Sequence, residues 1–411
     1  MKVLGSTYYS KRISQINSIT IHERIFHELE RRDRVLLPNL KTMIIEDRAN
    51  RYSSLFLAPP TQHLELQITP DDSNISRRLI DDIPLRSPRL KYLQLLRPSA
   101  WMRVEKDSFA APLPRLLNRL QDLEQFYFEW LHLSDEITIA VLQMSNLRKM
   151  TIYKEIAVLE RILLDHKVES PHLEEVTIRT DHFGVHSLAE LLISLRPALL
   201  TSFRVLAVSG YCYQVDLGGL FHAIGKHCSP TRFAKLTLAS DSFEQNSPEN
   251  ITTIYFSTLG PLLPFSQLRV LVLCNHPFDL TDEEIKEMAM AWPNLTTLEY
   301  EIIPTTSETR TTIWGLLWLA TFCRKLKYLT FNFNGTEQFS PDELALAANH
   351  GLTDLDVGDS MFDELEDVVE FMSTVFPTLP MITYCSWNDN TKSKWDKVEE
   401  LRCVSWPDGD T

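Results

Sequence analysis

The chain has 411 residues, of which 44% are hydrophobic and 23% are charged, and its formal net charge is -14 at pH 7. This composition excludes a disordered chain, and the acidic balance excludes a general electrostatic footprint for nucleic acid or for an anionic membrane surface. No run of about eighteen apolar residues occurs and the six cysteines show no paired spacing, so we expect no membrane span and a reducing, cytoplasmic or nuclear compartment.

A seven-residue pattern with apolar side chains at positions 1, 4 and 6 recurs along the chain, and residues 268–274 show it most clearly. Counted on this pattern, successive copies begin at Ile16, Leu40, Thr61, Leu90, Leu123, Leu147, Leu173, Phe203, Phe233, Leu268, Leu295, Leu326, Leu352 and Ile382. The thirteen steps cover 382 minus 16, or 366 residues, so the mean period is about 28 residues. This period is within the range of leucine-rich repeats.

Positions 4 and 6 share one face of a strand because strand side chains alternate, and strands that repeat with helices between them must run parallel. The sequence therefore predicts an α/β fold, a leucine-rich-repeat solenoid of about 14 irregular repeats with a curved parallel sheet on the concave side and helices on the convex side. We place the solenoid at residues 16–387, with a linker or N-terminal cap at 1–15 and a degenerate repeat or C-terminal cap at 388–411. In the last segment, Trp395, Leu401, Val404 and Trp406 form either a final degenerate copy or, as we favour, a cap on the open end of the core.

Amphipathic stretches between the copies predict helices at 135–144, 156–165, 187–195, 217–226, 252–262, 312–322 and 364–375. Two further helices begin at capping boxes, one from Thr281 to Glu284 and one from Ser340 to Glu343. We expect Gly351 to end the second of these.

Motifs for catalysis or metal binding are weak. His182 and His186 would lie one turn apart on a helix, but Gly184 disfavours a helix there and the Glu of a zinc-protease motif is missing. Phosphate-binding loops and nucleophile elbows need glycine patterns that the 12 glycines of this chain do not form. We therefore expect a protein that is not an enzyme, with no catalytic or metal-ligating residues and no cofactor.

The side chains between the core positions must face the open side of the sheet, where a partner protein could bind. Positions 3, 5 and 7 give an aromatic zone, an apolar zone and an acidic zone, and the candidate binding residues are Tyr92, Tyr127, Tyr153, Val205, Val270, Val272, Glu299, Glu301, Tyr328, Asp354 and Asp356. Tyrosine is enriched at interfaces, and clustered carboxylates favour a partner with a Lys/Arg-rich segment. The alternative is that β-propensity alone places Val, Thr and Tyr on this face.

Several copies resemble the repeat region of fungal F-box proteins with leucine-rich repeats. The resemblance lies in Leu-Pro-Asn-Leu-Lys-Thr-Met at 37–43, in residues 55–66, in Ser-Pro-Arg-Leu-Lys-Tyr-Leu at 87–93 and in Trp-Pro-Asn-Leu-Thr-Thr-Leu at 292–298; residues 8–16 are similar to the segment that follows the F-box. The resemblance implies a repeat region that holds the substrate of a cullin-type ubiquitin ligase, while the F-box binds the ligase adaptor.

The F-box itself is not seen, because the fifteen residues before the first copy cannot hold a helical domain of roughly forty residues. We therefore expect a non-catalytic protein-recognition module, monomeric by itself, that reaches a ligase adaptor only if a missing F-box is supplied upstream. The alternative is a structural or scaffold repeat protein with no link to ubiquitin ligation. Neither interpretation includes nucleic acid or a membrane as a partner.

Overall fold

The computed structural model describes residues 15–16, 35, 37–45, 54–67, 73–96, 112–166, 172–181, 187–195, 198–207, 217–240, 253–273, 276–300, 309–335, 339–384 and 389–404. The predictions that concern residues 1–14, Cys274, Glu301 and Trp406 lie outside these residues. Among the described helices, none combines the length and the apolar character needed to cross a membrane. The chain divides into two compact units, residues 1–181 with 194–198 and residues 182–193 with 199–411.

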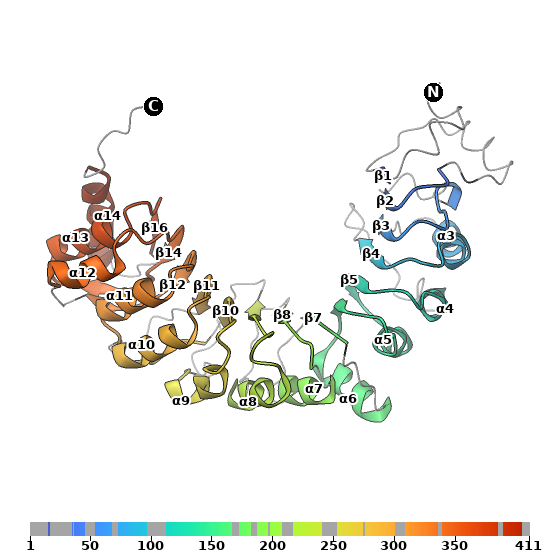
Figure 1. Ribbon diagram of the computed structural model, residues 1–411, viewed down its shortest axis with the longest axis horizontal. Coiled ribbons are helices and arrows are strands. Elements are labelled where there is room, and N and C mark those ends of the chain that lie inside the picture. Colours follow the sequence, from blue (N-terminus) through green and yellow to red (C-terminus); the bar gives the residue numbers. More distant parts are fainter. Residues whose placement is uncertain are drawn as a thin grey trace, which may run out of the picture. The chain divides into compact units, whose positions relative to one another are not determined.

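The first unit is built from parallel strands that follow one another in chain order. The strands are β1 (Gln15–Ile16), β2 (Thr42–Ile45), β3 (His63–Gln67), β4 (Tyr92–Leu96), β5 (Gln125–His132), β6 (Lys149–Tyr153) and β7 (Glu175–Thr180). Between them run α3 (Ser73–Arg86), α4 (Pro112–Arg119), α5 (Asp135–Leu142) and α6 (Ile156–His166). Within this unit the helices lie along one side of the strands and leave the other side open (Figure 1).

The second unit repeats this plan. Its strands are β8 (Ser202–Ala207), β9 (Lys235–Ser240), β10 (Val270–Leu273), β11 (Thr297–Tyr300), β12 (Tyr328–Thr330), β14 (Asp354–Asp356) and β16 (Ile382–Thr383), with a short separate pair β13 (Asn334–Gly335) and β15 (Met361–Phe362). Its helical segments are α8 (Leu217–His227), α9 (Phe256–Leu259), η4 (Gly260–Leu262), α10 (Asp282–Ala291), α11 (Ile313–Phe322), α12 (Pro341–Ala347), α13 (Leu365–Val375) and α14 (Asp389–Val404), and α7 (Ser187–Leu195) lies at the division between the units. The fold is therefore α/β, and each unit has the predicted leucine-rich-repeat architecture of parallel strands alternating with helices.

The core is formed by the apolar positions of the repeat. Leu268, Leu271 and Leu273 are completely buried, and the strand register aligns Leu271 with Leu236 on β9 and with Leu298 on β11. Each repeat thus stacks the same position of its neighbours into one continuous apolar row. Because burial of one leucine contributes about 2 kcal/mol, these rows rather than single contacts hold the repeats together.

Three copies occupy a different register from the one predicted. Phe203 pairs with Leu236, Ile16 with Met43, and Ile382 with Leu355, so each lies at position 4 rather than position 1. In the second unit the true first positions are Leu200 and Leu379, three residues earlier, and both are buried. The pattern alone cannot decide the register, because apolar residues are present in both alternatives. Residues 200, 203 and 205 fit positions 1, 4 and 6 as well as residues 203, 206 and 208 do.

The predicted helices are present, with ends that differ by a few residues. Both capping boxes are formed: Thr281 with Glu284 begins α10, and Ser340 with Glu343 begins α12. The prediction for Gly351 is wrong, because α12 ends at Ala347. Asn349 instead takes the left-handed conformation after the helix, with φ 58°, a conformation that asparagine tolerates better than most residues.

The last described segment is a helix, α14, and not a further strand copy at Leu401 and Val404. Trp395 on this helix is completely buried. Its indole packs edge-on against Phe333 and Phe362, and its Nε1 donates to the Ser360 carbonyl at 2.9 Å. Trp395, together with the equally buried Val398, therefore provides the apolar contacts of α14 with the preceding repeats.

Candidate protein-binding face

The open face of the first unit carries a row of rings. The register places His63, Tyr92, Gln125 and Lys149 at position 3 of four neighbouring strands. The rings of His63 and Tyr92 stack with centroids 3.7 Å apart and planes 8° apart, and the Tyr127 ring lies 5.1 Å from that of Tyr92. Tyr92 and Tyr127 are both half-buried. Of the three tyrosines predicted on this face in the first unit, the structure thus brings two together, and it adds His63, which position 3 of the copy at Thr61 would have indicated.

Neighbouring amides accept the hydroxyl protons of this row. Tyr92 donates to Oε1 of Gln94 at 2.5 Å, and Tyr127 donates to Oε1 of Gln125 at 3.1 Å. Burial raises the pKa of Tyr92 to about 12, with the charge of Glu65 adding to the effect. Burial also raises the pKa of Tyr127. Both phenols therefore stay neutral at physiological pH and offer ring surface to a partner.

A lysine–glutamate salt bridge and a histidine–glutamate contact lie at the two ends of the row of rings. Lys149 Nζ lies 2.7 Å from Glu175 Oε1, and this hydrogen bond raises the pKa of Lys149. At the other end, His63 Nε2 lies 2.8 Å from Glu65 Oε1. The charged groups that flank the rings therefore already have partners, so the rings are the part of this face that a ligand can use.

Tyr153, the third predicted tyrosine, belongs to a separate strand-end cluster with His132, Glu155 and Asp181. Its ring stacks on His132 with centroids 4.1 Å apart, and its hydroxyl donates to Oδ1 of Asp181. His132 Nε2 lies 2.9 Å from Oδ2 of Asp181. Burial opposes ionisation of Asp181, but hydrogen bonds from Tyr153 and His132 outweigh it, so the pKa of Asp181 lies below its usual value. Sequence reasoning missed this cluster because His132, Glu155 and Asp181 are each more than twenty residues apart along the chain.

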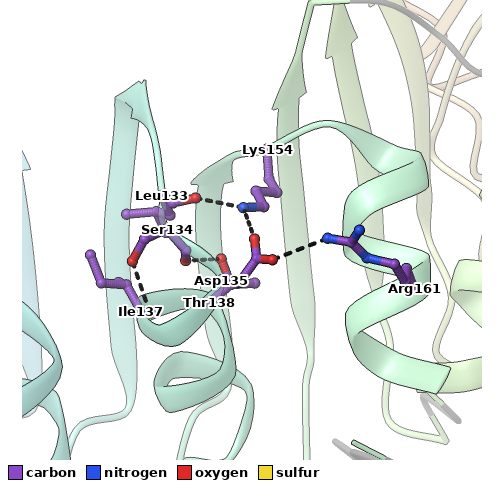
Figure 2. Close-up of polar contacts among 7 residues, drawn as sticks. All are labelled: Leu133, Ser134, Asp135, Ile137, Thr138, Lys154 and Arg161. Atoms are coloured by element: carbon purple, nitrogen blue, oxygen red, sulfur yellow. Dashed lines mark hydrogen bonds and ion pairs between the residues drawn. The ribbon is translucent and has the colours of Figure 1, made fainter. Parts of the chain in front are cut away.

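The backbone beside the strand-end cluster is fixed by a buried lysine (Figure 2). Lys154 Nζ donates to the Leu133 carbonyl at 2.6 Å and to Asp135 Oδ1 at 2.7 Å. Arg161 reaches the second oxygen of Asp135 from α6 at 3.1 Å, and the Ser134 side chain caps α5. The hydrogen bond from Lys154 is the largest cause of a lowered pKa at Asp135. The end of β6 is therefore tied to the start of α5.

The apolar zone predicted for the second unit is smaller than expected. Val205 is completely buried, so its placement on the open face is wrong. The three-residue shift of its repeat makes it position 6, a core position, and the exposed Arg204 occupies the open face instead. Val270 is half-buried on the open face, and Val272 retains only 8% exposure.

Three carboxylates form an acidic cluster on the open face of β11 and β14: Glu299, Asp354 and Asp356. Tyr328, which is 51% exposed, lies beside Asp354 on the intervening strand β12. Burial raises the pKa of Glu299 and of Asp356, and the charge of Asp354 raises both further. No basic side chain contributes to either shift, and in the described part of the chain none forms an ion pair with the cluster. Among the described residues, the repulsion between these carboxylates is therefore not offset by a basic side chain.

Comparison with known proteins adds the following. No protein-family model and no curated protein matches the chain. Among solved structures, the crystal structure of the Rad7 and Elc1 complex in yeast is similar at 16% identity with a TM-score of 0.41, over 82% of this chain and 78% of that one. The leucine-rich-repeat domain of APL1B is similar at 12% identity with a TM-score of 0.37, over 91% of this chain and 95% of that one. At these TM-scores neither likeness carries an argument about function, and the architecture is established by the strand order and register of the chain itself.

Proposed function

We propose that the chain is a non-catalytic protein-binding module that receives a Lys/Arg-rich segment of its partner on the acidic cluster of the second unit. The observation that carries this proposal is the raised pKa of both Glu299 and Asp356 beside Asp354. A raised carboxyl pKa means that the ionised form is held at a cost. A cationic side chain placed at the cluster would remove that cost and gain charge-assisted hydrogen bonds.

The surroundings of the cluster favour a polypeptide partner over a free ion. Tyr328 presents an exposed ring next to Asp354, and tyrosine contributes contact area while few rotamers are frozen on binding. The half-buried Val270 offers apolar surface on the same unit. A partner segment that alternates basic and apolar side chains matches this combination.

The row of rings on the first unit is proposed as a second contact region for the same class of partner. Aromatic side chains dominate the energetics of many interfaces, and the hydroxyls and charges around this row are already paired. The row therefore supports binding through ring contacts.

The finer assignment follows from the resemblance of residues 37–43 and 87–93 to fungal F-box proteins. We propose that the module presents the substrate of a ubiquitin ligase, in the cytoplasm or nucleus, and that it works as a monomer. Adaptor binding requires an F-box from outside the repeats, so fusing an F-box upstream should restore adaptor capture. A scaffold role through the helix side is the alternative, and it predicts partner capture that is insensitive to the acidic cluster.

The test uses a fluorescent Lys/Arg-rich peptide and an acidic peptide of equal length, titrated with the full chain. We expect the double variant Glu299→Gln, Asp356→Asn to bind the basic peptide about tenfold more weakly, since each lost charge pair contributes roughly 0.7 kcal/mol. The matched control is Glu287→Gln, Glu370→Gln, which removes the same charge from exposed positions on α10 and α13. Equal affinity of the two double variants, or preference for the acidic peptide, would refute the proposal.

A further inference from the structure

The strand-end cluster gathers metal-ligating groups from three neighbouring repeats. His132 ends β5, Glu155 follows β6 by two residues, and Asp181 follows β7 by one. The carboxyl ends of parallel strands meet at one edge of the sheet, so the fold itself brings these residues together. A register shift between Phe128 and His132 adds residues to β5 and sets His132 opposite Tyr153.

We propose that His132, Glu155 and Asp181 form a binding site for a divalent transition-metal ion, with Zn²⁺ as the best match. One ligand atom from each residue lies within 4.8 Å of the other two. Tetrahedral zinc with bonds of about 2.0–2.1 Å needs ligand atoms roughly 3.4 Å apart. The three side chains are only half-buried, so small rotations about their own bonds are enough to close this difference.

Hydrogen bonds outside the ligand set orient the two carboxylates. Tyr153 donates to Oδ1 of Asp181, and Thr180 donates to Oε2 of Glu155 at 3.3 Å. Each of these two carboxylates therefore keeps one oxygen engaged while the other can point into the site. Hydrogen-bonded ligands of this kind are the usual second layer of metal sites.

The backbone that carries the ligands is also held in place. The Leu133 amide donates to the Tyr153 carbonyl at 3.2 Å, and the Lys154 amide donates to the Arg179 carbonyl at 2.8 Å. Lys154 Nζ adds the links to Leu133 and Asp135 (Figure 2). The ammonium group of Lys154 is thus directed toward α5, where it pairs with Asp135. Lys154 therefore fixes the strand ends but does not neutralise the charge of Glu155 and Asp181.

The donor set decides the class of metal. Imidazole suits zinc, copper, iron and nickel, whereas calcium and magnesium take oxygen ligands only. One imidazole and two carboxylates carry a charge of -2 when both acids are ionised, which matches a divalent ion, and water would complete the coordination. Without metal, the same groups form the observed His132–Asp181 pair, which is the competing explanation of the cluster.

The experiment titrates ZnCl₂, and in separate runs MnCl₂ and MgCl₂, into the chelator-treated full chain by calorimetry. We expect one zinc ion per chain and weaker binding of magnesium. Each of His132→Gln, Glu155→Gln and Asp181→Asn should lower zinc affinity by about tenfold or more. His172→Gln and Asp165→Asn are matched controls on exposed residues of the same unit, and they should leave zinc affinity unchanged.

Glu155→Gln is the decisive variant because it keeps the shape of the side chain and removes its charge, while the amide can still reach the Thr180 hydroxyl and Asp181 that Glu155 contacts. Zinc should raise the melting temperature of the wild type and not that of this variant. Absence of saturable binding, or wild-type affinity in Glu155→Gln, would overturn the metal site and leave the His132–Asp181 pair as a structural contact. Peptide binding at the acidic cluster does not depend on this site, so chelation should leave it unchanged.

Discussion

Acidic side chains of this chain differ according to what faces them. Asp135 receives hydrogen bonds from Lys154 and Arg161, and its pKa is lowered chiefly by the bond from Lys154. Glu299 and Asp356 are more deeply buried and face other acids, so their pKa values are raised. Ionisation of Asp135 therefore stabilises the fold, whereas ionisation of Glu299 and Asp356 destabilises it.

The acidic cluster should therefore make stability depend on pH in a defined direction. A carboxyl group whose pKa is raised in the folded state contributes stability below its unfolded pKa and loses that contribution as the pH rises through the folded value. The stability of the double variant Glu299→Gln, Asp356→Asn relative to that of the wild type should therefore increase from about pH 3 to about pH 7. This range brackets the usual carboxyl pKa values. The melting temperatures of both proteins at the two pH values check this.

The opposite sign, a variant that is less stable at neutral pH, would show that the cluster is satisfied internally. The same double variant is expected to bind a basic peptide more weakly. Higher stability combined with weaker binding is typical of binding residues, whose unfavourable interactions in the free protein are relieved by the ligand.

At the scale of the elements, the start of α10 also supports the start of α11. Asp282 Oδ1 accepts from the backbone amides of Thr312 at 2.9 Å and Gly315 at 3.0 Å, and Oδ2 accepts from the Thr312 hydroxyl at 2.7 Å. A side chain from one repeat thus caps the helix of the next, thirty residues further on. Gly315 permits this close packing, since a Cβ there would lie 2.8 Å from the Phe331 ring.

Asp282→Ala should therefore destabilise the second unit by about 1–3 kcal/mol, because it removes the acceptor of the Thr312 amide and hydroxyl and one of the two acceptors of the Gly315 amide. Asp342→Ala is the matched control, because Asp342 lies in the first turn of α12 and is exposed, and the capping box there is formed by Ser340 and Glu343. Its cost should be about 0.5 kcal/mol or less. Urea unfolding followed by tryptophan fluorescence measures both, and equal midpoints would contradict the inter-repeat cap.

At the scale of the whole molecule, the repeats pack on their neighbours, so destabilisation should stay local. Leu298 is completely buried at the centre of the core row of the second unit. Leu298→Ala should cost about 2–5 kcal/mol, and amide exchange should accelerate in β10, β11 and β12. The strands β3 to β6 of the first unit should keep their protection, as expected for a repeat array with nearest-neighbour coupling.

Loss of protection in both units at the same rate would mean that the chain unfolds as one cooperative body. The exposed Leu346 provides a control, since Leu346→Ala removes the same number of atoms at a site that is 51% exposed. This variant should change exchange rates little in either unit.

The repeat could be predicted from the sequence because its apolar spacing lies within seven consecutive residues. Leu268, Leu271 and Leu273 show this spacing without reference to any other part of the chain. The register of β8 could not be fixed in the same way, since Leu200 and Phe203 each begin an acceptable copy. Only pairing with β9 decides between them, and that choice moved Val205 from the face to the core.

Contacts between residues far apart in the sequence could also not be predicted. The box at Thr281 was visible, but the bonds from Asp282 to α11 depend on how two helices lie side by side. His132, Glu155 and Asp181 were invisible for the same reason, although Glu155 and Asp181 follow equivalent strands by one or two residues. Aligning the residues just beyond each strand, and not only those within it, would have identified these two acids.

The order of strands in the second unit sets a length scale for any ligand of the acidic cluster. Glu299 on β11 and Asp356 on β14 are separated by one strand, β12, so they are two strand spacings apart, about 10 Å. A polyproline II segment advances by about 9 Å in three residues and returns to the same side. A segment with a basic residue at every third position would therefore engage both acids at once, and peptide libraries built on this period offer a direct search for the natural partner.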